Sequence, residues 1–160
     1  TTPTATATST PSATTAPTAA YPADVPAEAR ANTPAGAIAF AKHFFGQVNK
    51  AYTTPQAGLI APLSDLNCLS CASFADNADG YTRLGQRYSV EPIQVIEATT
   101  AKESPSSGGS VDVVLKQRAA KLIDPVGTVL DTFTEKQGAF LVQLQHRTEG
   151  WIVQKIQARQ

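Results

Sequence analysis

Apolar side chains recur with a helical period from Thr33 to about Thr53. Thr33 can cap a helix, and Pro34 suits the first helical turn because its missing N–H would have no partner there. The apolar positions that follow share one broad helical stripe: Ala37, Ile38, Ala41, Phe44, Phe45, Val48 and Tyr52. This spacing predicts one long helix that buries a single face.

Two shorter helices are expected next. Thr54-Pro55 repeats the start signal and predicts a short helix through Ile60 that ends before Pro62. A third helix should begin near Asn67, a good capping residue, and end at Gly85, which suits the left-handed position after a last turn.

From Tyr88 onward the pattern changes to runs of β-branched residues separated by turn residues. These runs predict four or five strands, over residues 88–99, 111–123, 128–134, 139–147 and 151–158. The segments 104–109 and 148–150 are typical of hairpin connections, so neighbouring strands should pair antiparallel. Helices followed by such strands predict an α+β domain in which a bent antiparallel sheet packs on helices grouped at one side.

The first 20 residues consist only of Thr, Ala, Pro and Ser. Such a segment has almost no apolar surface to bury against the entropy cost of folding, so we expect residues 1–31 to be a disordered tether and residues 32–160 to be one globular domain. Tracts of this composition resemble stalks that hold a domain away from a cell surface, and an ordinary disordered tail is the alternative.

Charge and motifs exclude several function classes. The chain has 13 basic and 13 acidic residues, and its scattered Lys and Arg lack the basic footprint of a nucleic-acid-binding protein. We also expect neither a membrane span nor a signal peptide in this sequence. A Gly-rich phosphate loop, a G-x-S-x-G elbow and an H-E-x-x-H pair are all missing from the sequence.

Two segments carry a resemblance to a known family. They are Thr33-Pro34-Ala35-Gly36-Ala37 with the aromatic-rich stretch that follows it, and Leu63-Ser64-Asp65-Leu66-Asn67-Cys68-Leu69-Ser70-Cys71. The sequence resembles, over residues 22–157, an uncharacterised family of actinobacterial lipoproteins that are similar to the nuclear transport factor 2-like cone. The resemblance implies a curved sheet of four or five strands wrapped around the long N-terminal helix, export, and a lipid-modified cysteine upstream of Thr1. It transfers no catalytic residue.

Cys68 and Cys71 are the two cysteines of the chain, and three interpretations compete for them. A structural disulfide fits an even cysteine count in an exported protein. A redox couple would use the start of a helix to lower a thiol pKa, although such pairs usually follow a strand. A zinc site would need further ligands, for which only His43 and His146 are available, so we expect no metal and no cofactor.

A pocket between sheet and helices is the other candidate site. We single out His146, Tyr52, Phe45 and Trp151 as residues that could line it or form its rim. Strand alternation points His146 to the apolar face of the sheet, but the sequence places no acid beside it to orient it as a general base. The aromatic residues could line a pocket or simply fill the core.

These observations favour a non-enzymatic binding or interaction module on a membrane-anchored lipoprotein outside the cytoplasm. Its partner would be a protein, an envelope component or a small apolar ligand, and the domain would be a monomer or a homodimer. The alternatives are an enzyme that acts on a small hydrophobic substrate in a cone-shaped pocket, and thiol–disulfide exchange through Cys68 and Cys71.

Overall fold

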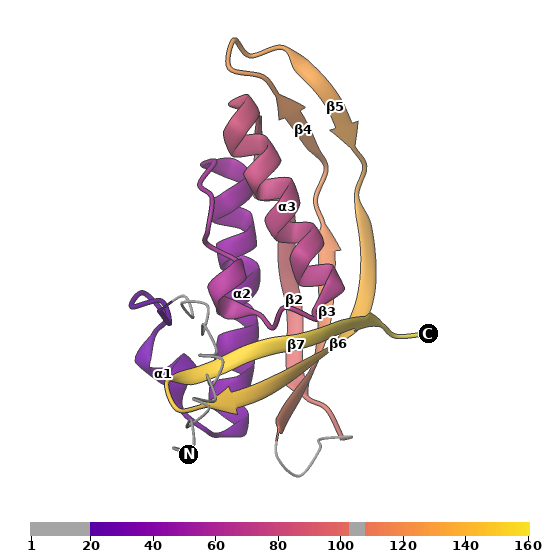
Figure 1. Cartoon of the computed structure of the whole chain (residues 1–160). Helices are drawn as coiled ribbons and strands as arrows, with labels where there is room; N and C mark the ends of the chain where they lie inside the picture. The colour runs from indigo at the N-terminus through magenta and orange to yellow at the C-terminus, as the bar shows by residue number, and fades with distance from the viewer. Residues whose placement is uncertain (1–19, 103–107) are drawn as a thin grey trace, which may run out of the picture.

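Helices occupy the first half of the fold and antiparallel strands the second half (Figure 1). The computed structural model describes residues 20–102 and 108–160. Its helices are α1 (Ala27–Arg30), α2 (Pro34–Thr53), the 3-10 turn η1 (Ala61–Leu63) and α3 (Leu69–Leu84). Its strands are β1 (Arg87–Tyr88), β2 (Ile93–Thr100), β3 (Gly108–Gln117), β4 (Ala120–Ile123), β5 (Val129–Phe133), β6 (Lys136–Arg147) and β7 (Gly150–Ala158).

The predicted long helix is confirmed as α2. The Thr33 hydroxyl accepts a hydrogen bond from the Gly36 N–H at 3.0 Å, which caps the helix, and Pro34 opens the first turn. Phe40, Phe44 and Val48 on its apolar stripe are fully buried. The sequence therefore specifies this helix through both its start signal and its period.

The predicted helix through Ile60 is wrong, because residues 54–60 form turns. Gly58 adopts a left-handed backbone with φ of 79°, which an α-helix cannot contain. Pro62 lies inside the 3-10 turn η1 instead of following a helix. The third predicted helix is confirmed as α3 and ends at Gly85, which has φ of 65°. Its N-cap is Cys68, while the Asn67 side chain bonds Asp65.

The expectation of one curved sheet wrapped around the long helix is wrong. The strands form a four-stranded sheet in the order β2-β3-β6-β7 and a three-stranded sheet in the order β1-β4-β5, both antiparallel. Pro92 separates β1 from β2, because proline has no N–H to donate to a strand partner. Residues 118–119 separate β3 from β4, and residues 134–135 separate β5 from β6. The β4–β5 hairpin therefore extends beyond the four-stranded sheet (Figure 1).

The core lies between α2 and the inner face of the four-stranded sheet. The sheet contributes side chains that are at most 2% exposed: Val111, Val113, Val142, Leu144 and Val153. Alternation along β6 places Val142 and Leu144 on this face, as the sequence predicts.

Residues 20–31 pack against α2 and β7. Val25 and Ala29 are buried, and the Tyr21 hydroxyl donates a hydrogen bond to the Trp151 carbonyl at 3.0 Å. The remainder of the predicted tether, residues 1–19, and most of the predicted loop 104–109 lie outside the described residues. Among the helices of the described chain, none has the length and apolar character needed to cross a membrane.

Candidate functional site

A cavity of about 500 Å³ lies where the C-terminal end of α2 and the middle of α3 meet the junction of the two sheets. Most of its wall is apolar or aromatic. It is lined by Tyr52, Phe74, Asn77, Tyr88, Pro92, Ile93, Leu115, Gln117, Phe133, Lys136, Gln137, Gly138 and Phe140. Pockets of this size and chemistry bind small molecules in many proteins.

A chain of stacked aromatic rings forms one wall of the cavity. The Tyr88 ring stacks on Tyr52 at a centroid distance of 5.3 Å and on Phe133 at 5.1 Å. Tyr81 meets Tyr52 edge-on at 5.2 Å. These rings come from α2, α3, β1 and β5, so this wall exists only when the three-stranded sheet and both long helices are in place.

Asn49 of α2 fixes the position of Ile93 in the opposite wall. Its side-chain amide donates to the Ile93 carbonyl at 2.6 Å and accepts from the Ile93 N–H at 2.9 Å. Asn49 is 7% exposed, and these two bonds satisfy a buried polar group while they hold the start of β2 against α2.

The two tyrosines that line the cavity keep their phenol groups protonated over a wide pH range. Burial raises the pKa of Tyr52 to about 12, against a smaller opposing effect of the hydrogen bond from Asn77. Burial, together with the hydrogen bond to Tyr81, also raises the pKa of Tyr88. Neither phenol is therefore set up as a base near neutral pH.

Among the lining residues with amide or ammonium groups, Asn77 comes from α3, and Gln117, Lys136 and Gln137 come from β3 and β6. Gln117 lies directly opposite Lys136 in the strand register, and Gly138 lies opposite Leu115. Asp and Glu are both missing from the residues that line the cavity. The polar edge therefore offers amides and one ammonium group.

A second, smaller pocket of about 150 Å³ lies at the opposite end of α2. Its lining includes Thr33, Ala37, Ser110 and Trp151. The Trp151 indole N–H donates to the Ala31 carbonyl at 2.8 Å, which fixes the ring across the start of α2. The Ser110 hydroxyl is buried here without a hydrogen-bond partner in the described structure.

The structure does not bring the four residues singled out from the sequence together in one site. Tyr52 lines the larger cavity and Trp151 the smaller one. Phe45 is 2% exposed and packs edge-on against Phe44 in the core at 5.5 Å. His146 lines neither pocket and meets the Trp151 ring edge-on at 4.8 Å.

His146 makes a structural contact. Its Nε2 lies 2.9 Å from the Arg30 carbonyl oxygen, and because a carbonyl can only accept, Nε2 carries the proton. The imidazole therefore ties β6 to the end of α1. This contact supplies no acid partner of the kind a catalytic base requires.

Sequence reasoning missed Phe133 and Lys136 as cavity residues. The alternation of Lys136, Gly138 and Phe140 along β6 was an available signal, because it places a charged residue on the apolar face of a strand. Phe133 carried no comparable signal, because it meets Tyr88 only through the pairing of β1 and β5 with β4.

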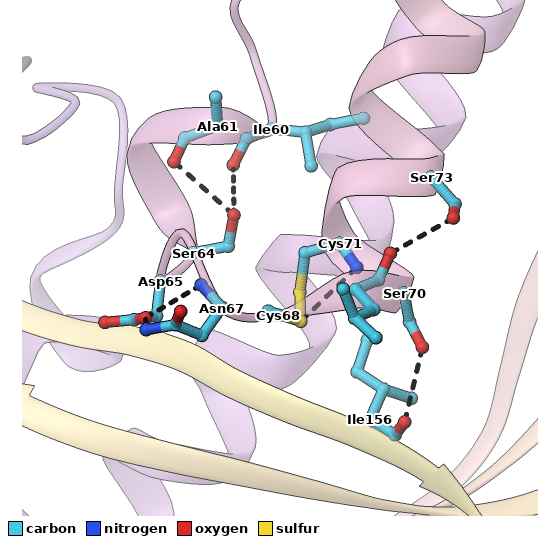
Figure 2. The surroundings of a disulfide bond; sticks show 11 residues. Ile60, Ala61, Ser64, Asp65, Asn67, Cys68, Ser70, Cys71, Ser73 and Ile156 are labelled. Carbon is cyan, nitrogen blue, oxygen red and sulfur yellow. Dashed lines mark hydrogen bonds between the residues drawn. A yellow bond between two sulfur atoms is a disulfide. The ribbon is translucent and has the colours of Figure 1, made fainter.

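The predicted disulfide between Cys68 and Cys71 is confirmed (Figure 2). Both cysteines are 1% exposed, and Cys68 Sγ also accepts a hydrogen bond from the Cys71 N–H at 3.3 Å. Asp65 and Ser70 tie the surrounding segment to β7, through bonds to the carbonyls of Val153 and Ile156. The same segment leaves Leu66 98% and Leu69 81% exposed.

Residues 20–102 and 108–160 contain no group of three or more His, Cys, Asp or Glu side chains that could hold a metal ion. Cys68 and Cys71 are joined in the disulfide, so neither offers the free thiolate that the zinc interpretation would need.

Two solved structures are similar to this chain. One is the intermembrane space region of the chloroplast protein ARC6, with 12% sequence identity and a TM-score of 0.49; the match covers 76% of this chain and 95% of that one. The other is described as a calcium/calmodulin dependent protein kinase II association domain from Xanthomonas campestris, with 14% identity and a TM-score of 0.45; the match covers 81% of this chain and 91% of that one.

Among curated proteins, no sequence matches this chain. One protein family does, and its match runs over residues 5–157, which is nearly the whole sequence. The chain therefore belongs to DUF6318, a family of unknown function.

Proposed function

We propose that this domain is a non-enzymatic binding module that takes a small apolar ligand into the cavity between α2, α3 and the two sheets. The observation that carries the proposal is the 500 Å³ cavity with its wall of aromatic and aliphatic side chains. Transfer of apolar ligand surface from water to such a wall is favourable by about 25 cal/mol per Å². The stacked rings Tyr52, Tyr88 and Phe133 hold that wall in shape before a ligand arrives.

The ionisable groups that line the cavity support binding over acid–base catalysis. They are Tyr52, Tyr88 and Lys136, and burial keeps both phenols protonated near neutral pH. His146, the candidate base of the alternative enzyme, is engaged with the Arg30 carbonyl outside the cavity. Thiol–disulfide exchange is disfavoured because Cys68 and Cys71 are both 1% exposed, which shields them from an attacking thiolate.

We further propose that the domain works outside the cytoplasm on a lipoprotein anchored to the cell membrane through a cysteine upstream of Thr1. The disulfide supports this location, because disulfides persist in oxidising compartments. The Thr/Ala/Pro/Ser composition of residues 1–20 supports a spacer between anchor and domain. The reading frame upstream of Thr1 tests the anchor: an apolar segment that ends in a cysteine supports it, and any other sequence there contradicts it.

Ligand binding can be tested with N-phenyl-1-naphthylamine, a neutral apolar probe whose fluorescence rises in an apolar site. We expect saturable binding to the protein and its loss in Leu115→Trp, because the indole would occupy the cavity. Leu130→Trp is the matched control, since Leu130 is 47% exposed and does not line the cavity.

Equal probe binding by wild type and Leu115→Trp, or no saturable binding by wild type, would contradict the proposal. If Leu115→Trp does not unfold cooperatively, Gln117→Trp replaces it, because this half-buried residue lies at the polar edge where a larger side chain narrows the entrance.

A further inference from the structure

Lys136 places a positive charge on the inner face of the four-stranded sheet. Alternation along β6 puts it on the same face as Gly138, Phe140 and Val142, and Val142 lies in the hydrophobic core. Its neighbour across the strand pair, Gln117, shares that face. Lys136 is exposed at the start of β6, and it lines the cavity.

The carboxylates around Lys136 are engaged elsewhere. Glu135, its neighbour in sequence, forms an ion pair with Lys116 at 2.9 Å. In the part of the chain that the structure describes, Lys136 has no ion pair, and the cavity lining contains no Asp or Glu. The Lys136 charge is therefore left available to a ligand.

Lys136 is the charged residue among those that line the cavity, and it lies at the edge formed by β3 and β6. An anionic group at this edge would meet the Lys136 ammonium and the amide of Gln117, its neighbour across the strand pair. The lining formed by Tyr52, Tyr88 and Phe133 is aromatic. The cavity therefore has one charged edge and one aromatic wall.

We propose, building on the binding function above, that the ligand is an amphiphile with an anionic head group. Its head group pairs with the Lys136 ammonium and accepts a hydrogen bond from the Gln117 amide. Its apolar part extends along Phe140, Leu115 and Ile93 toward the stacked rings. Lysine acts on an anion as a point charge, so the inference concerns the charge of the head group rather than its shape.

The test compares octanoate, octanol and octylamine, which share one chain length and differ in head-group charge, as displacers of N-phenyl-1-naphthylamine. We expect Lys136→Gln to weaken the binding of octanoate about three- to fivefold, the range for a partly exposed ion pair. The binding of octanol should be unchanged. Lys136→Glu should weaken the binding of octanoate further and strengthen the binding of octylamine. Lys121→Gln is the control, since Lys121 is exposed on β4 and does not line the cavity.

The experiment distinguishes failure of this inference from failure of the binding function. If the probe and octanol bind but Lys136→Gln changes octanoate and octanol alike, the anionic head group is refuted while the apolar cavity stands. If no probe or alkyl compound binds, both proposals are refuted. If the Lys136 variants do not fold, binding by the wild type is measured at several ionic strengths. Octanoate binding must weaken relative to octanol binding as ionic strength rises, and an unchanged ratio of the two affinities overturns the inference.

Discussion

The backbone of Gly36, in the first turn of α2, lies directly against the carbonyl group of Ala31. A β-carbon added to Gly36 would meet the Ala31 oxygen and would come within 2.9 Å of its carbonyl carbon. Both are main-chain atoms, so neither can rotate out of the way. Gly36 is therefore required by the close approach of the chain as it turns from α1 into α2.

Gly36→Ala should lower the free energy of unfolding by about 1–3 kcal/mol, the usual cost of overpacking. Gly46→Ala is the matched control in the same helix, because a β-carbon there would meet no atom within 4 Å. That change should raise stability by about 0.5–1 kcal/mol, since alanine favours a helix over glycine. Urea denaturation of both variants measures the difference, and a gain of stability in Gly36→Ala would contradict the described turn.

Leu63 and Leu66 are three positions apart and have opposite environments. Leu63 is fully buried, so Leu63→Ala should cost about 2–5 kcal/mol of unfolding free energy. Leu66 is 98% exposed, so Leu66→Ala should change stability by less than about 0.5 kcal/mol. Thermal and urea unfolding measure both values, and similar costs for the two variants would show that the segment before α3 packs differently.

The buried tyrosines predict a loss of stability at alkaline pH. The folded-state pKa of Tyr52, about 12, lies above the ordinary tyrosine value of 10.0, so its contribution is complete below about pH 10 and is lost as pH rises toward 12. Tyr88, whose pKa is also raised, should act in the same direction. In Tyr52→Phe, the urea concentration at the midpoint of unfolding should fall less steeply over this pH range.

The comparison of wild type with Tyr52→Phe isolates the phenol, because lysines that titrate in the same range are common to both proteins. A fall of identical steepness in the two proteins would mean that Tyr52 is accessible to solvent in the folded state.

The disulfide should resist reduction in the folded protein and contribute modestly to stability. Dithiothreitol should leave it intact under native conditions, because both cysteines are buried, and should reduce it readily in urea. The double variant Cys68→Ser/Cys71→Ser should still fold and should lose up to about 2 kcal/mol, since the bond joins residues separated by only three positions. Mass spectrometry after alkylation follows the reduction, and equal rates in both conditions would restore thiol exchange as a candidate function.

Local periodicity explains which elements could be predicted from the sequence. The helix from Pro34 to Thr53 was predictable because its cap, its proline and its apolar stripe agree. The division into two sheets was harder to predict, because the run over residues 111–123 shows no turn signal at positions 118–119, where the chain passes from one sheet to the other. Pro92 was the one visible sign, since it cannot donate a hydrogen bond within a strand.

The cavity was only partly predictable for the same reason. Tyr52 and Phe45 lie on one helical stripe, yet Tyr52 reaches the cavity and Phe45 fills the core. Which of them borders the cavity depends on where β1 and β5 lie in the fold, and the local sequence pattern does not contain that information.

The contact between Tyr21 and the β6–β7 turn determines how a tethered domain would be presented. Tyr21 is held beside Gly150 and Trp151, at the end of α2 that carries Ala37. Tyr52 and the large cavity lie roughly 20 Å farther along the helix, at 1.5 Å per residue. A domain attached through its amino-terminal segment would therefore have its large cavity at the end of α2 that lies farther from the attachment point.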